Sequence, residues 1–167
     1  MSQIQQIYGG LITNWSELGG NDESIVAYQR PANSASQNAM ATLVMNGKSL
    51  MEAPKENLTD STSTITNFIS DYKNTTNAIG YSYYFYASDM YQSIDTNVTS
   101  NVKLLGIDGV KPTKKTIKDE TYPLHTSYYI IINANDDSDS KAKILADQML
   151  SSRGQLVAEN AGYIPVK

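Results

Sequence analysis

Short apolar runs alternate with segments of helical periodicity along this chain of 167 residues, and that alternation constrains its fold most strongly. Strand-like runs rich in β-branched or aromatic residues occur at 25–28, 78–83, 102–107 and 124–133. Between them, apolar residues recur at i, i+3, i+4 and i+7, which predicts amphipathic helices. Strands that alternate with helices indicate the α/β class. We therefore predict a three-layer α/β sandwich around a mixed, mostly parallel sheet.

Apolar stripes and capping residues place the helices. The predicted helices cover 3–8, 34–45, 63–73, 84–92, 139–151 and 154–160, and a short helical piece ends at Lys118. The run at 124–133 is the longest apolar segment, and nearly all of its central residues are apolar or aromatic. A strand of that composition is typical of a sheet centre that is covered on both faces.

One strand-to-helix junction has the residues of an anion site. The predicted strand at 25–28 leads into Arg30, and a helix is predicted from Ser34. The first N–H groups of a helix lack intrahelical partners, and the helix dipole adds partial positive charge there. An oxyanion can bind at such an end, where Arg30 adds a two-pronged donor and Ser34 and Ser36 add hydroxyls. An ordinary serine cap beside a surface arginine is the alternative.

The composition excludes several classes of function. A net charge of −4 gives no general basic field for nucleic acid or an anionic membrane. The absence of cysteine excludes disulfides, thiolate metal sites and cysteine nucleophiles, and His125 is the only histidine. We predict neither a metal site nor another cofactor. The N-terminal residues 1–6 lack the basic and apolar regions of a signal peptide, and no stretch approaches the length of a membrane span.

Two other classes of function remain open from the residues alone. A binding or adhesion module would use the 12 tyrosines and the hydroxyl-rich surface, although core and rim packing also explains tyrosines. An enzyme would need Ser34 or Ser36 as nucleophile and His125 as a base within hydrogen-bond distance. His125 stands at the start of a predicted strand, where a packing or surface role is favoured. We therefore assign no catalytic residue.

Several short motifs follow one another in an order that is known from one family. They are I-Y-G-G-L-I-T-N-W-S-E-L-G-G at 7–20, A-I-G-Y at 78–81, V-K-L-L-G-I-D-G-V-K-P-T at 102–113, Y-P-L at 122–124, G-Q at 154–155 and G-Y-I-P at 162–165. Together they resemble the phosphate-type periplasmic binding proteins, which are the substrate-binding components of phosphate ABC transporters.

The resemblance implies a type 2 periplasmic-binding-protein fold, in which two α/β lobes joined by a hinge bury an anion between them. It covers nearly the whole chain and begins where such proteins enter their second lobe. We therefore expect residues 1–167 to form a single α/β domain, the second lobe, with 124–167 as a segment that returns toward the first lobe. The first lobe, the signal peptide and the lipid-anchor cysteine of the family would precede Met1.

The resemblance also implies which residues contact the ligand, because residues 30–36 stand where the family has its R-x-x-x-S-G-T phosphate loop. Arg30 would pair with phosphate oxygens, and Ser34 would donate its hydroxyl and its N–H. Ala35 and Ser36 would donate N–H groups, and Asn33 completes the set. Alanine replaces the family's glycine at 35, and its methyl group is expected to crowd the anion or to exclude a positive φ. Serine replaces threonine at 36 and keeps the hydroxyl.

Two further departures concern charge. Gln37 stands where the family often has a second arginine, and no aspartate separates Arg30 from Ser34. A carboxylate there would accept the proton of a protonated phosphate, which sulfate does not have. The ligand implied is therefore phosphate or another oxyanion.

The function implied is non-enzymatic anion binding, as part of the extracytoplasmic solute-binding component of a phosphate ABC importer. The expected partners are inorganic phosphate or a similar oxyanion, the first lobe and the ABC permease subunits, without nucleic acid. Because other contacts would come from the first lobe, weak binding is expected of this chain alone. A binding, adhesion or sensory module that keeps the fold without phosphate transport is the alternative.

Overall fold

The structure is a computed structural model that describes residues 1–58, 77–88 and 102–166. Its contacts divide into two compact units, Met1–Asp108 and Gly109–Lys167, which we describe separately. The predicted helix at 63–73 and the second half of the one at 84–92 lie outside the described residues. The prediction of a single domain with a returning segment stays a prediction.

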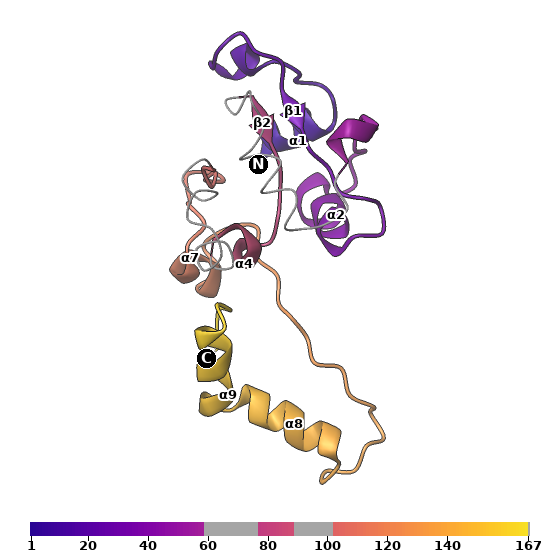
Figure 1. Cartoon of the computed structure of the whole chain (residues 1–167), viewed down its shortest axis with the longest axis vertical. Helices are drawn as coiled ribbons and strands as arrows, with labels where there is room; N and C mark the ends of the chain where they lie inside the picture. The colour runs from indigo at the N-terminus through magenta and orange to yellow at the C-terminus, as the bar shows by residue number, and fades with distance from the viewer. Residues whose placement is uncertain (59–76, 89–101, 167) are drawn as a thin grey trace. The chain divides into compact units, whose positions relative to one another are not determined.

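A two-stranded parallel sheet lies in the first unit, with the strands β1 (Val26–Ala27) and β2 (Ala78–Ile79) side by side (Figure 1). Val26 pairs with Ala78 and Ala27 with Ile79. The Tyr28 N–H continues the ladder by donating to the Ile79 carbonyl over 2.9 Å. On the other side of β1, an isolated parallel bridge joins Gln29 to Leu58. The predicted parallel sheet is confirmed, although both strands are shorter than the apolar runs.

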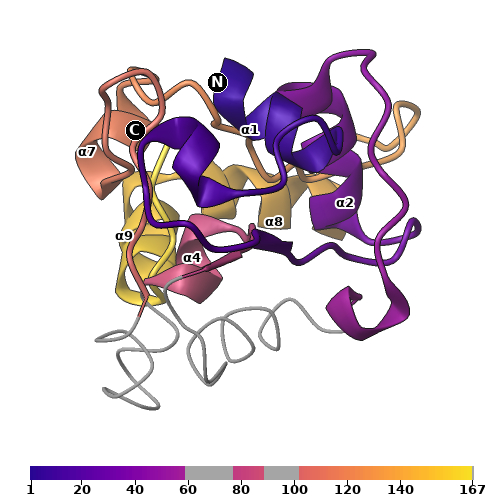
Figure 2. The same ribbon diagram turned by 90° about the horizontal axis from the view of Figure 1, so that it is seen from above.

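The first unit also contains helices that supply much of its buried core. Ile7, Tyr8 and the helical stretch 35–45 supply buried side chains, and α1 contacts η2, the helix that directly continues α2. The helices α1 and α2 are labelled in Figure 1 and Figure 2. Tyr8 and Met45 are the largest fully buried side chains among the described residues. The helices are α1 (Ser2–Tyr8), η1 (Trp15–Leu18), α2 (Ala35–Ala39), the π-helix η2 (Met40–Met45), η3 (Lys55–Asn57) and α4 (Tyr84–Ala87).

The motif N-W-S-E-L-G-G has a structural role. Asn14 caps η1, and the Glu17 side chain accepts the Asn14 N–H in a capping box. The helix ends at Gly19, whose φ of 82° suits glycine. The Trp15 indole N–H donates to the Asn77 carbonyl over 3.0 Å, directly before β2. This motif therefore ties the connector to the start of the second strand.

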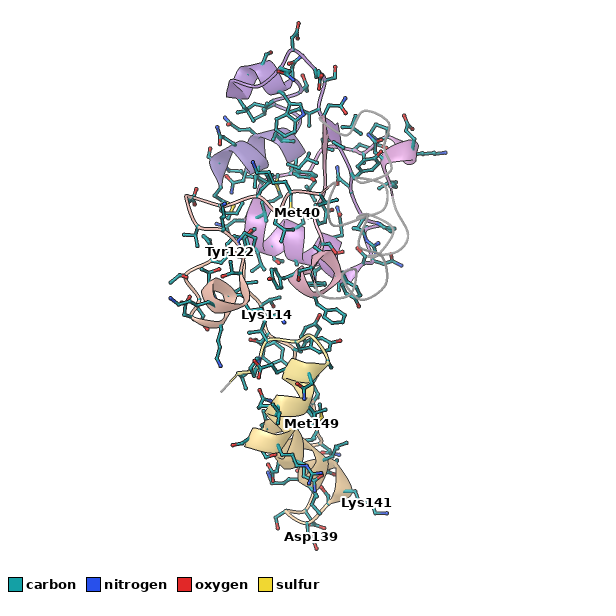
Figure 3. The ribbon with its side chains drawn as sticks, turned by 60° about the vertical axis from the view of Figure 1, so that its left-hand side comes forward. Met40, Lys114, Tyr122, Asp139, Lys141 and Met149 are labelled. Carbon is teal, nitrogen blue, oxygen red and sulfur yellow. The ribbon has the colours of Figure 1, made fainter. Side chains whose placement is uncertain are left out.

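The second unit contains α7 (Lys114–Lys118), α8 (Lys141–Leu150) and α9 (Ser152–Asn160), which confirms helices at all three places. Figure 3 labels Lys141 at the beginning of α8 and Met149 near its end. Ser151 joins α8 to α9: its hydroxyl donates to the Gln148 carbonyl and accepts the Gly154 N–H. A side chain at Gly154 would place its Cβ 2.2 Å from the Gln148 carbonyl oxygen, so only glycine fits there.

The prediction of a central strand at 124–133 is wrong for this structure. The segment forms neither helix nor strand and is drawn as a plain trace in Figure 1. Tyr129 is 81% exposed and Ile131 is 92% exposed. A strand forms only where neighbouring strands accept and donate its backbone hydrogen bonds, and the described residues offer this segment no such neighbour. The predicted strand at 102–107 is also absent, although Ile107 is buried.

Candidate anion-binding site

Arg30 follows the carboxyl end of β1 and is only 5% exposed. Its Nε and Nη1 atoms are buried and make no hydrogen bond in the structure. A buried charged donor without a partner is costly, because burial removes its water without replacing it. The guanidinium therefore holds donors ready for an acceptor that residues 1–58, 77–88 and 102–166 do not supply.

The loop after Arg30 turns directly into helix α2. The Ser34 N–H donates to the Pro31 carbonyl over 2.9 Å, and Ser34 is the N-cap of α2. Its hydroxyl oxygen accepts the Gln37 N–H over 3.2 Å, which leaves the hydroxyl hydrogen available. The helical geometry gives the N–H groups of Ala35 and Ser36 no intrahelical partner. The serine cap is thus real, and it is compatible with an anion at the same helix end.

Ser36 supplies a second unpaired buried donor. The residue is 5% exposed, and its Oγ atom is buried without a hydrogen-bond partner. Buried hydroxyls are nearly always paired, so two unpaired side chains within seven residues need an explanation. A bound oxyanion provides one, because its oxygens accept from guanidinium, hydroxyl and backbone N–H groups alike.

The remaining predicted residues lie at the surface of the same loop. Asn33 and Ala35 are exposed, and no hydrogen bond of the Asn33 side chain is described. Ala35 is the first residue of α2 and is not among the residues with positive φ. The backbone at position 35 therefore does not adopt the positive φ that would require glycine. The expected exclusion of a positive φ by alanine thus has no consequence for this loop. The contact of these residues with an anion stays a prediction.

Three residues that the sequence did not assign to the site hold Arg30 in place. The Arg30 backbone N–H donates to Gln37 Oε1 over 3.1 Å and to the Tyr81 hydroxyl over 3.2 Å. Gln37 Nε2 donates to Gln29 Oε1 over 3.2 Å, and Gln29 Nε2 donates to the Met51 carbonyl. The predicted parallel pairing of the strands β1 and β2 could have indicated these contacts. Such pairing brings the residues that follow both strands to one edge of the sheet.

Burial raises the pKa of Tyr81 to about 12, against a lowering by its hydrogen bond with Arg30 and the nearby guanidinium charge. Burial also raises the pKa of Tyr8 well above its usual value. The two rings make an edge-to-face contact, with centroids 5.4 Å apart. Both phenols are therefore held neutral at neutral pH.

These pKa shifts predict a loss of stability at alkaline pH. A tyrosine whose pKa is higher in the folded state stabilises that state below its unfolded pKa, and the contribution disappears as the pH rises through the folded pKa. The free energy of unfolding, measured by urea denaturation, is expected to fall between about pH 10 and pH 12. Tyr81→Phe is expected to make this fall shallower. If the free energy of unfolding falls equally steeply with pH in the Tyr81→Phe variant and in the wild-type chain, the raised pKa of Tyr81 is not the cause.

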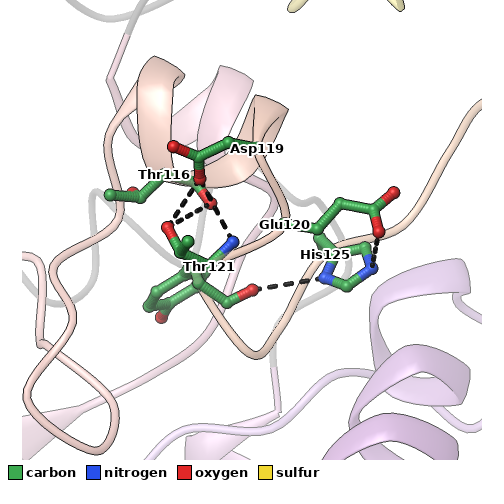
Figure 4. A network of polar contacts seen from close by, with 6 residues as sticks. Thr116, Asp119, Glu120, Thr121 and His125 are labelled. Carbon is green, nitrogen blue, oxygen red and sulfur yellow. Dashed lines mark hydrogen bonds and ion pairs between the residues drawn. The ribbon is translucent and has the colours of Figure 1, made fainter.

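His125 lies in a polar network of the second unit (Figure 4). Its Nδ1 is 3.2 Å from the Tyr122 carbonyl, and its Nε2 is 3.9 Å from the Glu120 carboxylate. Beside it, Thr121 donates hydrogen bonds to Asp119 that lower the pKa of that carboxyl. These contacts order an exposed turn, which agrees with a surface role for the histidine.

Two kinds of feature are absent from residues 1–58, 77–88 and 102–166. No group of three or more histidine, cysteine, aspartate or glutamate side chains there could hold a metal ion. None of the helices in those ranges combines the length and hydrophobicity needed to cross a membrane.

Known proteins are similar in sequence to this chain over nearly its whole length. The chain is 31% identical over 166 residues to the phosphate-binding protein PstS of Bacillus subtilis, covering 98% of this chain and 49% of that protein. It is 26% identical over 166 residues to PstS of Borreliella burgdorferi, covering 98% of this chain and 57% of the relative. The chain thus spans about half the length of the curated relatives it matches.

Solved structures give the same result. A phosphate ABC transporter substrate-binding protein from Clostridium perfringens, solved with bound phosphate, has a TM-score of 0.70 at 26% identity and aligns over 99% of this chain and 61% of its own. An ABC-type phosphate transport receptor from Vibrio cholerae has a TM-score of 0.68 at 26% identity, over 98% and 62%. These similarities confirm the predicted fold. Residues 1–152 also match the family described as PBP superfamily domain, and the chain therefore belongs to the PBP superfamily.

Proposed function

We propose that this chain is the second lobe of a phosphate-binding protein and supplies one wall of its anion site. The observation that supports this most directly is the pair of buried, unpaired side chains, Arg30 and Ser36, at the start of α2. One cation and several neutral dipoles suit an oxyanion that is removed from water. Asn33, Ser34 and Ala35 complete the proposed contacts. The role is binding without catalysis, as in the transport proteins that the chain resembles.

The second part of the proposal concerns the rest of the binding protein. Residues 124–167 are proposed to return to a first lobe and to pack there. Among the described residues of the second unit, Ala146 has the only buried apolar side chain. Many large apolar side chains of the same unit are exposed. The relatives are about twice as long as this chain, which leaves room for a further lobe that would cover these side chains. The exposed side chains include Tyr128, Tyr129, Ile130, Ile131, Ile144, Leu145, Met149, Leu150, Leu156 and Val157.

A protein of this kind would capture phosphate outside the cytoplasm and present it to the permease subunits of an ABC importer. Partners and location are proposed from the relatives, whose names describe phosphate binding and ABC-type phosphate transport. An anion that is enclosed by two lobes loses its water and gains donors from both sides. A single lobe offers only half of these donors, so the chain alone is expected to bind phosphate with a millimolar Kd.

Thermal unfolding of the chain tests the proposed ligand. A ligand that binds only the folded state stabilises it by RT ln(1 + [L]/Kd). Phosphate at about ten times Kd should therefore add roughly 1.4 kcal/mol and raise Tm by about 3–6 °C. The control is sodium chloride at the same ionic strength.

The same experiment with sulfate tests the role of the missing carboxylate. Residues 30–37 contain no aspartate or glutamate, so this loop supplies no carboxylate that would accept the proton of a protonated phosphate. Sulfate is expected to raise Tm about as much as phosphate does. Tm values that are equal in phosphate and in chloride would overturn the proposed function.

A further inference from the structure

Gln37 connects the three segments that meet at the proposed anion site. Its side-chain oxygen accepts the Arg30 N–H, at the end of β1, over 3.1 Å. The same oxygen accepts the Tyr81 hydroxyl, which follows β2. The backbone N–H of Gln37 donates to Ser34 Oγ at the start of α2. One neutral side chain thus ties the arginine, the capping serine and the second strand together.

Tyr81 adds a second, rigid support. Its hydroxyl oxygen accepts the Arg30 N–H over 3.2 Å, so this N–H is shared between two acceptors. Its ring packs edge to face against Tyr8, at a centroid distance of 5.4 Å and an interplanar angle of 73°. Tyr8 is 1% exposed, and its hydroxyl donates to the Tyr28 carbonyl. The phenol oxygen is therefore held by the core rather than by the loop.

This arrangement supports the backbone of Arg30 while leaving its guanidinium available. Both acceptors bind the backbone N–H, whereas the buried Nε and Nη1 atoms stay without a partner. Fixing the backbone reduces the conformational freedom that the side chain must lose when it binds an anion. A carboxylate at the same place would neutralise the arginine, and a second cation would repel it. Glutamine and tyrosine support it without either effect.

We propose that Gln37 and Tyr81 are positioning residues of the anion site, which hold Arg30 ready for the ligand without contacting it. The inference rests on the proposed function, because it concerns the affinity of that same site. It predicts that removing either polar group weakens anion binding although the guanidinium, the serines and the start of α2 remain.

The test compares Gln37→Met and Tyr81→Phe with the wild-type chain in an NMR titration with inorganic phosphate. Methionine keeps the volume of glutamine without the acceptor, and phenylalanine keeps the ring contact with Tyr8. Tyr8→Phe is the matched control, since it removes the other hydroxyl of the same aromatic pair, which contacts Tyr28 instead of Arg30. Three quantities are measured: the phosphate Kd, Tm without phosphate, and the chemical shift of the Arg30 amide proton.

Both variants at the site are expected to raise the phosphate Kd by about fivefold, the effect of one net hydrogen bond. Their Arg30 amide proton should move upfield before any phosphate is added, because an acceptor is lost. Tyr8→Phe should lower Tm while leaving the Kd and this amide shift unchanged. If a merely structural role were correct, all three variants would change Tm and leave the Kd unchanged, which would overturn the inference.

The outcomes separate the inference from the proposed function. A wild-type chain without any phosphate-dependent shift would remove the proposed function, and the inference with it. A wild-type chain that binds phosphate, with both variants binding equally well, would remove the inference alone. If Gln37→Met does not fold, the Tyr81→Phe result decides, because that variant loses a single oxygen atom.

Discussion

Replacement of Arg30 by alanine is expected to abolish the stabilisation of this chain by phosphate. Arg30 is the one residue of the loop 30–36 with a positive side chain, and its buried Nε and Nη1 atoms have no acceptor within the part of the chain that the structure describes. Hydrogen bonds to charged groups contribute about 1.5–3 kcal/mol each, so the loss should exceed about tenfold in affinity. The difference in Tm between phosphate and chloride solutions, measured for both proteins, reports it.

The control is Arg153→Ala, which makes the same change in charge at the only other arginine. Arg153 is exposed on α9, and the variant should retain the full response to phosphate. Arg30→Ala should leave Tm without phosphate nearly unchanged, because the loss of packing is offset by the removal of a buried charge that has no ion pair among the described residues. If the Arg30→Ala chain still responds fully to phosphate, the anion does not bind at this loop.

The second large effect is expected from Met45→Ala, in the core of the first unit. Met45 is 0% exposed at the end of η2, the helix that contacts α1. Truncating a buried methionine removes transfer free energy and leaves a cavity, which together cost about 2–5 kcal/mol. Urea denaturation gives the free energy of unfolding. Leu43→Ala, two residues earlier and 45% exposed, should cost much less. Equal losses would show that the core lies elsewhere.

The sequence predicted those elements whose signals are local. The strand at 26–27 and the helix from Ala35 were both expected, because an apolar run, a capping serine and an apolar stripe follow one another there. The cap at Ser34 is formed as predicted, by acceptance of the Gln37 N–H. Helix α8 begins after Ser140, whose hydroxyl accepts the Lys143 N–H in the same way.

The strand predicted at 124–133 shows the limit of local signals. Its apolar composition indicates that other residues shield the segment from water, but it does not indicate which residues these are. In this chain Tyr129 and Ile131 are largely exposed, so the coverage is not supplied by the residues described. A strand depends on partners that are distant in sequence, whereas a helix satisfies its own backbone groups.

The residues that contact Arg30 in the proposed anion site could not be predicted from the sequence for a related reason. In the sequence, Gln37 is notable only as the replacement of an arginine, and Tyr81 only as part of the A-I-G-Y motif. Their contacts with Arg30 depend on the pairing of β1 with β2, which brings residues 51 positions apart to one edge. The sequence indicates Arg30 and Ser36 as ligand-binding candidates of one loop, and their contact with an anion stays a prediction. That both are buried, with polar atoms that lack a partner among the described residues, became visible only in the structure.

The measurement that tests the central proposal most directly is an NMR titration of the chain labelled with ¹⁵N, with phosphate added at constant ionic strength. The proposal predicts saturable shifts of the Arg30 Nε–H and of the Ser36 backbone N–H, with one common millimolar Kd, while amides of the second unit stay unchanged. Shifts that miss both groups, or that increase linearly without saturation, would contradict an anion site at this loop.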